Sequence, residues 1–264
     1  MKLKEYEFGF ADATKEYSRK PEIFKSAFCD TRNYVSKLID SYEFLLIGRK
    51  GVGKTAYSSR LQSISDKEDS LFTFSMNLND FEFSTFAKTG IDNDVIGTQK
   101  YKTSWDFLLL MSIYKVLYND FRMTEIEEIN QIISLLDLMG FSLDDGYKTD
   151  ITKLSKIKIG AGIAKFDIEF ERAFNVQPKT YLERISVLTE KMLSVINNTY
   201  LNERKILIIL DGLDDILRYR KNKMEIIASL VRSADYINDS VIRHGKNIKI
   251  LILIREDILS CKRP

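Results

Sequence analysis

Short runs of consecutive apolar residues limit the folds open to this chain of 264 residues. The clearest runs are Phe44–Ile47, Ile206–Leu210 and Ile250–Ile254. Their apolar residues do not alternate with polar ones, so each run predicts a strand that is buried on both faces. Leu71–Leu78 does alternate and predicts a further strand. Strands buried on both faces are typical of a parallel sheet that helices cover.

Helical patterns fill the intervals between these strands. Apolar residues follow a helical period in three stretches, Ile126–Met139, Tyr181–Ile196 and Met224–Ile237. Trp105–Tyr118 is apolar almost throughout, as a buried helix would be, and another helix is expected over Pro21–Leu38. We therefore expect the α/β class, with a three-layer sandwich in which helices cover both faces of a central parallel sheet.

We expect one domain over residues 1–264. It consists of a helical lead-in (1–40), a half with a glycine-rich loop (41–100), a helical insertion (101–180) and a half with an acidic strand end (181–264). Within the insertion, the stretch "KIKIGAGIAKFDIEFER" alternates on either side of a glycine pair, which is typical of a β-hairpin.

The inventory of side chains excludes several classes of site. Two cysteines, Cys29 and Cys261, without a CxxC pair exclude a disulfide scaffold and a cysteine zinc site, and they fit a reducing cytoplasm. The single histidine, His244, excludes a multi-histidine metal centre. A formal net charge of +2 and the lack of a basic stripe with aromatic residues give no indication of nucleic-acid binding. The charged N-terminus is no signal peptide, and no apolar run approaches the roughly 18–20 residues of a membrane span, so we expect a cytoplasmic protein.

The sequence "GRKGVGKT" lies between a predicted strand and a predicted helix. It fits the phosphate-loop pattern G-x-x-x-x-G-K-[ST] at every constrained position. Its glycines let several backbone N–H groups point at one anion, and the positive end of the next helix adds to that field. Lys54 would reach the β- and γ-phosphates of a nucleotide, and the Thr55 hydroxyl would coordinate Mg²⁺. The expected phosphate-binding residues are Gly48, Arg49, Lys50, Gly51, Val52, Gly53, Lys54 and Thr55. The alternative is a glycine turn that matches the pattern by chance.

A phosphate loop requires a second motif, an apolar strand that ends in an acid. Asp211 directly follows Ile206–Leu210, and at the carboxyl end of a parallel strand it would face the same crevice as the loop. We expect Asp211 and Thr55 to be the metal ligands. Asp214 or Asp215 could orient the water that attacks the phosphate, and the sequence does not separate the two. The competing interpretation is a solvated acidic turn after a core strand.

Three positive side chains accompany these motifs. Arg255 closes the last predicted strand and could sense the γ-phosphate; the alternative is a surface cation at a strand end. Arg49 and Lys50 lie within the loop, where they add positive charge or contact the nucleotide of a neighbouring subunit.

The motifs "GRKGVGKT" and "LIILDGLDD" resemble those of the P-loop ATPases of the ASCE division. Within that division they are most similar to the STAND class, with its NACHT-type pattern of an apolar strand followed by Asp-Gly-x-Asp-Asp/Glu, and "FLLIGRKGVGKTA" is similar to the loops of a set of bacterial P-loop ATPases. The resemblance implies that Gly48–Thr55 is the phosphate loop, Asp211 the magnesium acid, Asp214 or Asp215 the catalytic acid, and Arg255 the sensor.

The same resemblance implies a function. It implies ATP and Mg²⁺ as ligands, hydrolysis of ATP, nucleotide-controlled assembly as a homo-oligomer or multi-subunit complex and, for many of the bacterial proteins, defence against phage. It covers residues 11–84 and 181–261 and hardly extends to the region between them. The family pattern continues with a fifth strand, a second sensor and a helical or winged-helix lid, whereas this chain closes with "IREDILSCKRP". We expect the lid to come from a longer chain or from another subunit.

Three other functions are compatible with a phosphate loop. A scaffold that binds nucleotide without turnover is the main alternative. A GTPase is disfavoured because "NKME" (Asn222–Glu225) only approximates the guanine-reading pattern and begins a predicted helix instead of following a strand. A small-molecule kinase is disfavoured because those enzymes lack the doubled acid and place their motifs closer together.

Overall fold

In the part of the chain that the computed structural model describes, four strands form one parallel sheet. They are β1 (Leu45–Gly48), β2 (Leu71–Asn77), β3 (Lys205–Asp211) and β4 (Ile248–Arg255), and their spatial order is β1-β4-β3-β2. The structure describes residues 9–77, 99–141, 143, 181–201, 204–213, 217 and 222–259. The predicted β-hairpin, Asp214 and Asp215 lie outside them.

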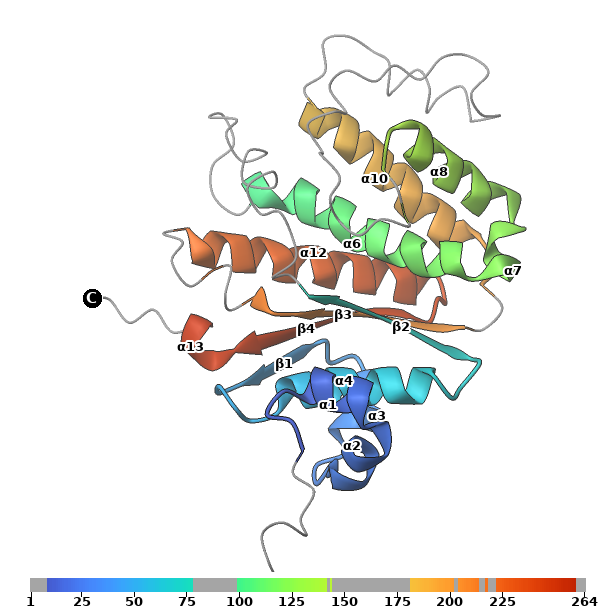
Figure 1. Cartoon of the computed structure of the whole chain (residues 1–264). Helices are drawn as coiled ribbons and strands as arrows, with labels where there is room; N and C mark the ends of the chain where they lie inside the picture. The colour runs from blue at the N-terminus through green and yellow to red at the C-terminus, as the bar shows by residue number, and fades with distance from the viewer. Residues whose placement is uncertain are drawn as a thin grey trace, which may run out of the picture.

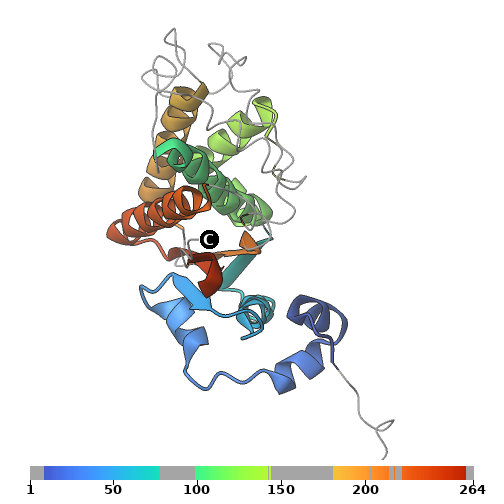
Figure 2. The same cartoon turned by 90° about the vertical axis from the view of Figure 1, so that its left-hand side faces the viewer.

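Helices cover both faces of the sheet, as Figure 1 and Figure 2 show. Below the sheet in Figure 1 lie α1 (Ala13–Arg19), α2 (Pro21–Ala27), α3 (Tyr34–Asp40) and α4 (Lys54–Ser65). Above it, α6 (Gln99–Asn119) and α12 (Lys223–Arg243) contact the strands, and α7 (Phe121–Thr124), α8 (Glu127–Leu138) and α10 (Tyr181–Asn198) pack on α6. The short helix α13 (Glu256–Leu259) follows β4 directly. The prediction of an α/β protein with a central parallel sheet is confirmed. Among the described residues, no helix combines the length and the hydropathy that a bilayer crossing requires.

The two central strands, β3 and β4, contribute to a separate core on each face of the sheet. Their even-numbered apolar residues, such as Ile208, belong to the larger core, which α6, α8, α10 and α12 complete. Their odd-numbered apolar residues, such as Ile209, belong to a smaller core with Leu38 of α3 and Leu61 of α4. Because both faces are covered, the strands need apolar residues at nearly every position, which explains the continuous runs in the sequence.

The helix predicted over 21–38 is interrupted in its middle, so that prediction is wrong. The structure ends α2 at Ala27 and begins α3 at Tyr34. The Asp30 carboxylate accepts hydrogen bonds from the backbone amides of Tyr34 and Val35, at 2.9 and 2.8 Å. These amides belong to the first turn of α3, where no preceding helical carbonyl is available, so a side-chain acceptor compensates for the break.

The register of the sheet brings three strand ends together. Gly48 of β1 pairs with Arg255 of β4, and Leu210 of β3 pairs with Ile252 of β4. Strand alternation places Asp211 and Arg255 on the face that α4 covers, together with the odd-numbered core residues. The chain leaves β1 towards α4 below the sheet and leaves β3 towards α12 above it (Figure 1). Connections that leave on opposite faces open a binding crevice at the carboxyl edge of a parallel sheet.

Candidate functional site

The loop between β1 and α4 is shaped by its glycines. Gly53 is the N-cap residue of α4 with φ 88°, a left-handed conformation that favours glycine, and no side chain caps the helix. A Cβ at Gly48 would lie 2.8 Å from Cγ2 of Val52, because the loop folds back closely on the end of β1. The positive end of α4 therefore faces the loop without a side-chain anion of its own.

Lys54 folds back over this loop. Its ammonium group donates hydrogen bonds to the backbone carbonyls of Gly48 and Arg49, each at 3.1 Å. The charge of Lys54 and the uncapped start of α4 thus lie on the same short stretch of chain. An anion placed there would be attracted by both.

Thr55 and Asp211 are in direct contact. The Thr55 hydroxyl donates a hydrogen bond to Oδ2 of Asp211 at 2.8 Å, although the two residues are 156 positions apart. Oδ1 of Asp211 accepts a hydrogen bond from the Gly212 amide at 2.8 Å. This contact places the acidic end of β3 next to the first turn of the helix that follows the loop, and the metal-binding role of the two residues stays a prediction.

The Thr55–Asp211 pair is a suitable donor set for Mg²⁺. This ion prefers oxygen ligands, retains several waters and is usually held by one or two protein groups together with substrate phosphates. Over the described parts of the chain, no group of three or more His, Cys, Asp or Glu side chains could hold a metal ion. Thr55 and Asp211 together offer a hydroxyl and a carboxylate, which could hold such an ion next to a phosphate ligand.

Arg255 lies beside the loop and is bonded to an acid. Its Nε donates to Oδ1 of Asp257 at 2.9 Å, and a second guanidinium nitrogen donates to Oδ2. The hydrogen bonds and charge of Arg255, with a smaller effect of the Lys54 charge, lower the pKa of Asp257 below its ordinary value. The structure thus places Arg255 at the level of Gly48, with its guanidinium held by the first turn of α13.

A second acid of α13 contacts the loop itself. Nε of Arg49 lies 3.3 Å from Oε2 of Glu256, and both side chains are largely exposed, by 83% and 59%. Sequence reasoning missed Glu256 and Asp257, although they directly follow Arg255. Only the pairing of β4 with β1 shows that this chain segment lies next to the loop.

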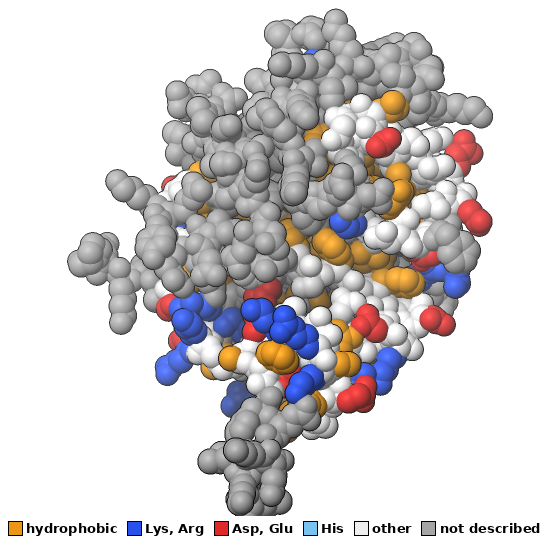
Figure 3. Space-filling model, in the orientation of Figure 1, with side chains coloured by type: hydrophobic (Ala, Val, Ile, Leu, Met, Phe, Trp, Pro, Cys, Tyr) orange, Lys and Arg blue, Asp and Glu red, His pale blue; other side chains and the backbone are white. Residues whose placement is uncertain are grey.

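The remaining loop residues face solvent. Lys50 and Gly51 are exposed, and the Val52 side chain is 58% exposed. Figure 3 shows Lys and Arg side chains gathered at the left of the molecule at the level of the sheet, on the side where β4 ends. The catalytic acids that the sequence predicts, Asp214 and Asp215, lie outside the described residues and stay predictions.

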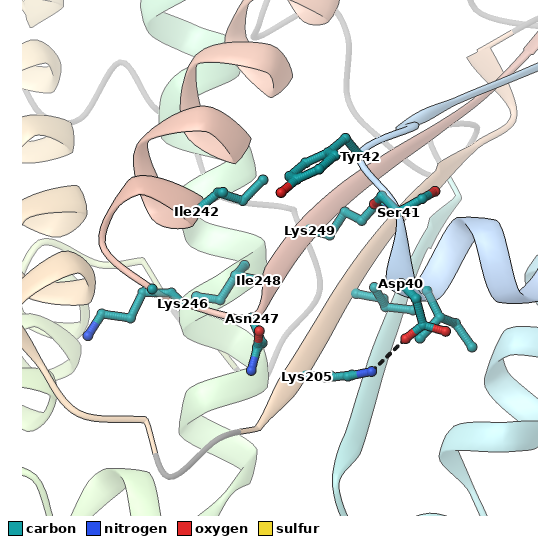
Figure 4. A pocket seen from close by; sticks show the side chains of 12 residues that line it. Asp40, Ser41, Tyr42, Lys205, Ile242, Lys246, Asn247, Ile248 and Lys249 are labelled. Atoms are coloured by element: carbon teal, nitrogen blue, oxygen red, sulfur yellow. Dashed lines mark hydrogen bonds and ion pairs between the residues drawn. The ribbon is translucent and has the colours of Figure 1, made fainter.

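A cavity of about 310 Å³ lies at the opposite, amino edge of the sheet (Figure 4). Lys205 forms an ion pair with Asp40 there, at 2.6 Å. Lys249, only 8% exposed, donates to three carbonyls at the end of α3, those of Lys37, Leu38 and Ser41. Both lysines bond to α3 or to the residue that follows its C-terminal end, so the cavity lies where this helix is attached to the sheet. The loop at the carboxyl edge is therefore the stronger candidate site.

Comparison with known proteins adds no assignment: no protein-family model, no curated protein and no solved structure matches the chain.

Replacement of Thr55 and Asp211 tests whether the loop and the strand end are joined as described. A double-mutant cycle of Thr55→Val and Asp211→Ala, measured by urea unfolding, should give a coupling of about 1–2 kcal/mol, because each change removes the same charge-assisted hydrogen bond. Thr55→Ser retains the hydroxyl and serves as the control that should keep most of the stability. Additive effects of Thr55→Val and Asp211→Ala, within about 0.5 kcal/mol, would contradict the contact.

Lys249 should make the stability of the protein depend on pH. Burial lowers the pKa of the Lys249 ammonium from 10.5 to about 8. Between these pH values the unfolded chain holds a proton that the folded chain has released, so a rise in pH through this window stabilises the folded state. Urea unfolding at about pH 7.5 and about pH 9.5 should show the wild type gaining stability relative to Lys249→Met. The control Lys205→Met, at the same edge of the sheet, should keep the wild-type dependence. Parallel pH profiles for the wild type and Lys249→Met would show this assignment to be wrong.

Proposed function

We propose that the chain is a P-loop ATPase that binds ATP with Mg²⁺ at Gly48–Thr55 and hydrolyses it to ADP and phosphate. The observation that carries the proposal is the hydrogen bond between Thr55 and Asp211, because it joins two motifs that are distant in the sequence. The parallel sheet, with the loop at its carboxyl edge and α4 directly behind it, supports the P-loop fold.

The residues of the loop would bind the phosphates through charge and backbone amides. Lys54 would exchange the neutral carbonyls of Gly48 and Arg49 for phosphate oxygens, which are stronger acceptors because they are charged. Thr55 and Asp211 would hold Mg²⁺. The ion, when bound, neutralises negative charge on the phosphates.

Hydrolysis requires further groups. A side chain must orient the attacking water, and Asp214 and Asp215 are the candidates that the sequence supplies. Arg255 is the candidate for contact with the terminal phosphate, since its strand position is level with the start of the loop. To contact the phosphate, the Arg255 guanidinium would have to break its hydrogen bonds to Asp257, or keep them while it turns towards the ligand.

The biological role would be that of a nucleotide-controlled oligomerisation switch, with anti-phage defence as the setting. This part of the proposal is supported by the resemblance of the two motifs to those of STAND ATPases. Arg49 and Lys50 are exposed at the loop, where a second subunit could approach them. A scaffold that binds ATP without turnover would use the same loop, so phosphate release distinguishes the two.

Lys54→Ala tests nucleotide binding most simply. In calorimetric titrations with ATP and Mg²⁺, the wild type should bind, and the variant should bind about 10- to 100-fold more weakly because it lacks a charge-assisted hydrogen bond to phosphate. Lys205→Ala, at the opposite edge of the sheet, is the matched control and should bind like the wild type.

Three results would count against the proposal. ATP turnover at the parent rate in Lys54→Ala would exclude this loop as the site. If GTP competed for the site more strongly than ATP, the chain would be specific for guanine and not for adenine. Binding of ATP without any release of inorganic phosphate would favour the scaffold.

A further inference from the structure

A cluster of two ion pairs lies where the loop and α13 adjoin: Arg49 with Glu256, and Arg255 with Asp257. The ammonium group of Lys54 bonds to the backbone carbonyls of Gly48 and Arg49 on the same loop. The pairing of β1 with β4 creates this cluster, because it places Gly48, at the start of the loop, level with Arg255, and the two acids follow Arg255 directly.

The contacts in this cluster run between opposite charges. Glu256 binds the guanidinium of Arg49 from the loop, and Asp257 binds that of Arg255. The positive charge of Lys54 also acts on Asp257, since it contributes to the lowered pKa of that carboxyl. The positive groups that would attract a phosphate are therefore already compensated in part by two carboxylates of α13.

Glu256 connects the loop to α13, and Asp257 connects the end of β4 to the same helix. This helix begins at Glu256, immediately after β4, and its Ile258 side chain is buried in the larger core. The structure shows two kinds of contact for α13: apolar ones to the core, through Ile258 and Leu259, and ionic ones to the loop and the end of β4, through Glu256 and Asp257. Of these, the ionic contacts respond to charge that arrives in the loop.

We propose that Glu256 and Asp257 are internal counter-ions of the loop, which a nucleotide triphosphate displaces, so that nucleotide binding and the first turn of α13 are coupled. This inference depends on the proposed binding of ATP. A triphosphate attracts Arg49 and Lys54 and repels both carboxylates. The Arg49–Glu256 pair is exposed to solvent, and exposed ion pairs are weak, so a polyphosphate can replace the glutamate.

Neutralising the acids should tighten nucleotide binding. In calorimetric titrations with ATP and Mg²⁺, Glu256→Gln and Asp257→Asn should each lower the Kd about two- to fivefold, and the double variant about tenfold. Each change removes a carboxylate that competes with the phosphates for a positive side chain and repels them. Asp239→Asn is the matched control: it removes an exposed acid paired with Arg243 on α12, and it should leave the Kd unchanged.

Hydrogen exchange measures the coupling to α13 directly. In the wild type, ATP with Mg²⁺ should increase amide exchange over residues 256–259, since the ionic contacts of the helix are lost. In the variant with both Glu256→Gln and Asp257→Asn, exchange there should be fast already without nucleotide and should change little on binding.

The outcomes separate this inference from the proposed function. If the wild type does not bind ATP with Mg²⁺, both are wrong. If it binds ATP, but the Kd of the two variants equals that of the wild type and exchange over residues 256–259 does not respond to nucleotide, the proposed function stands and the counter-ion role is overturned.

Discussion

The contact between the Thr55 hydroxyl and the Asp211 carboxylate is the interaction on which the rest of the site depends. It exists because β4 lies between β1 and β3 and aligns their carboxyl ends. Strand alternation then turns Asp211 towards α4, whose first turn supplies Thr55. A sheet with one residue of register slip would turn the carboxylate to the opposite face and separate the two motifs.

The attachment of α4 to the sheet serves the same geometry. Much of the interface between α4 and β2 is polar: the Ser58 and Ser75 hydroxyls are 3.0 Å apart, and the Thr73 hydroxyl donates to the side chain of Gln62 at 2.8 Å. Hydrogen bonds of this kind fix distance and orientation more narrowly than apolar contact does. They hold the helix that follows the loop in one position relative to the strand ends, which a site assembled from separate segments requires.

Local patterns in the sequence predicted much of this arrangement. Continuous apolar runs predicted β1, β3 and β4, alternation predicted β2, and helical periods predicted the long helices above the sheet. The break between α2 and α3 did not follow, because the apolar period continues across it while Asp30 caps α3 from outside. Glu256 and Asp257 were missed for another reason: their importance depends on the pairing of β4 with β1, and no local pattern encodes which strands become neighbours.

A crystal structure of the chain with Mg²⁺ and a non-hydrolysable ATP analogue would show whether the loop and Asp211 form one nucleotide site. We expect phosphate density within the Gly48–Thr55 loop, Lys54 bound to phosphate oxygens, and a metal ion next to the Thr55 hydroxyl and the Asp211 carboxylate. Nucleotide bound elsewhere, or a loop left empty at saturating analogue with the Thr55–Asp211 hydrogen bond intact, would contradict this expectation.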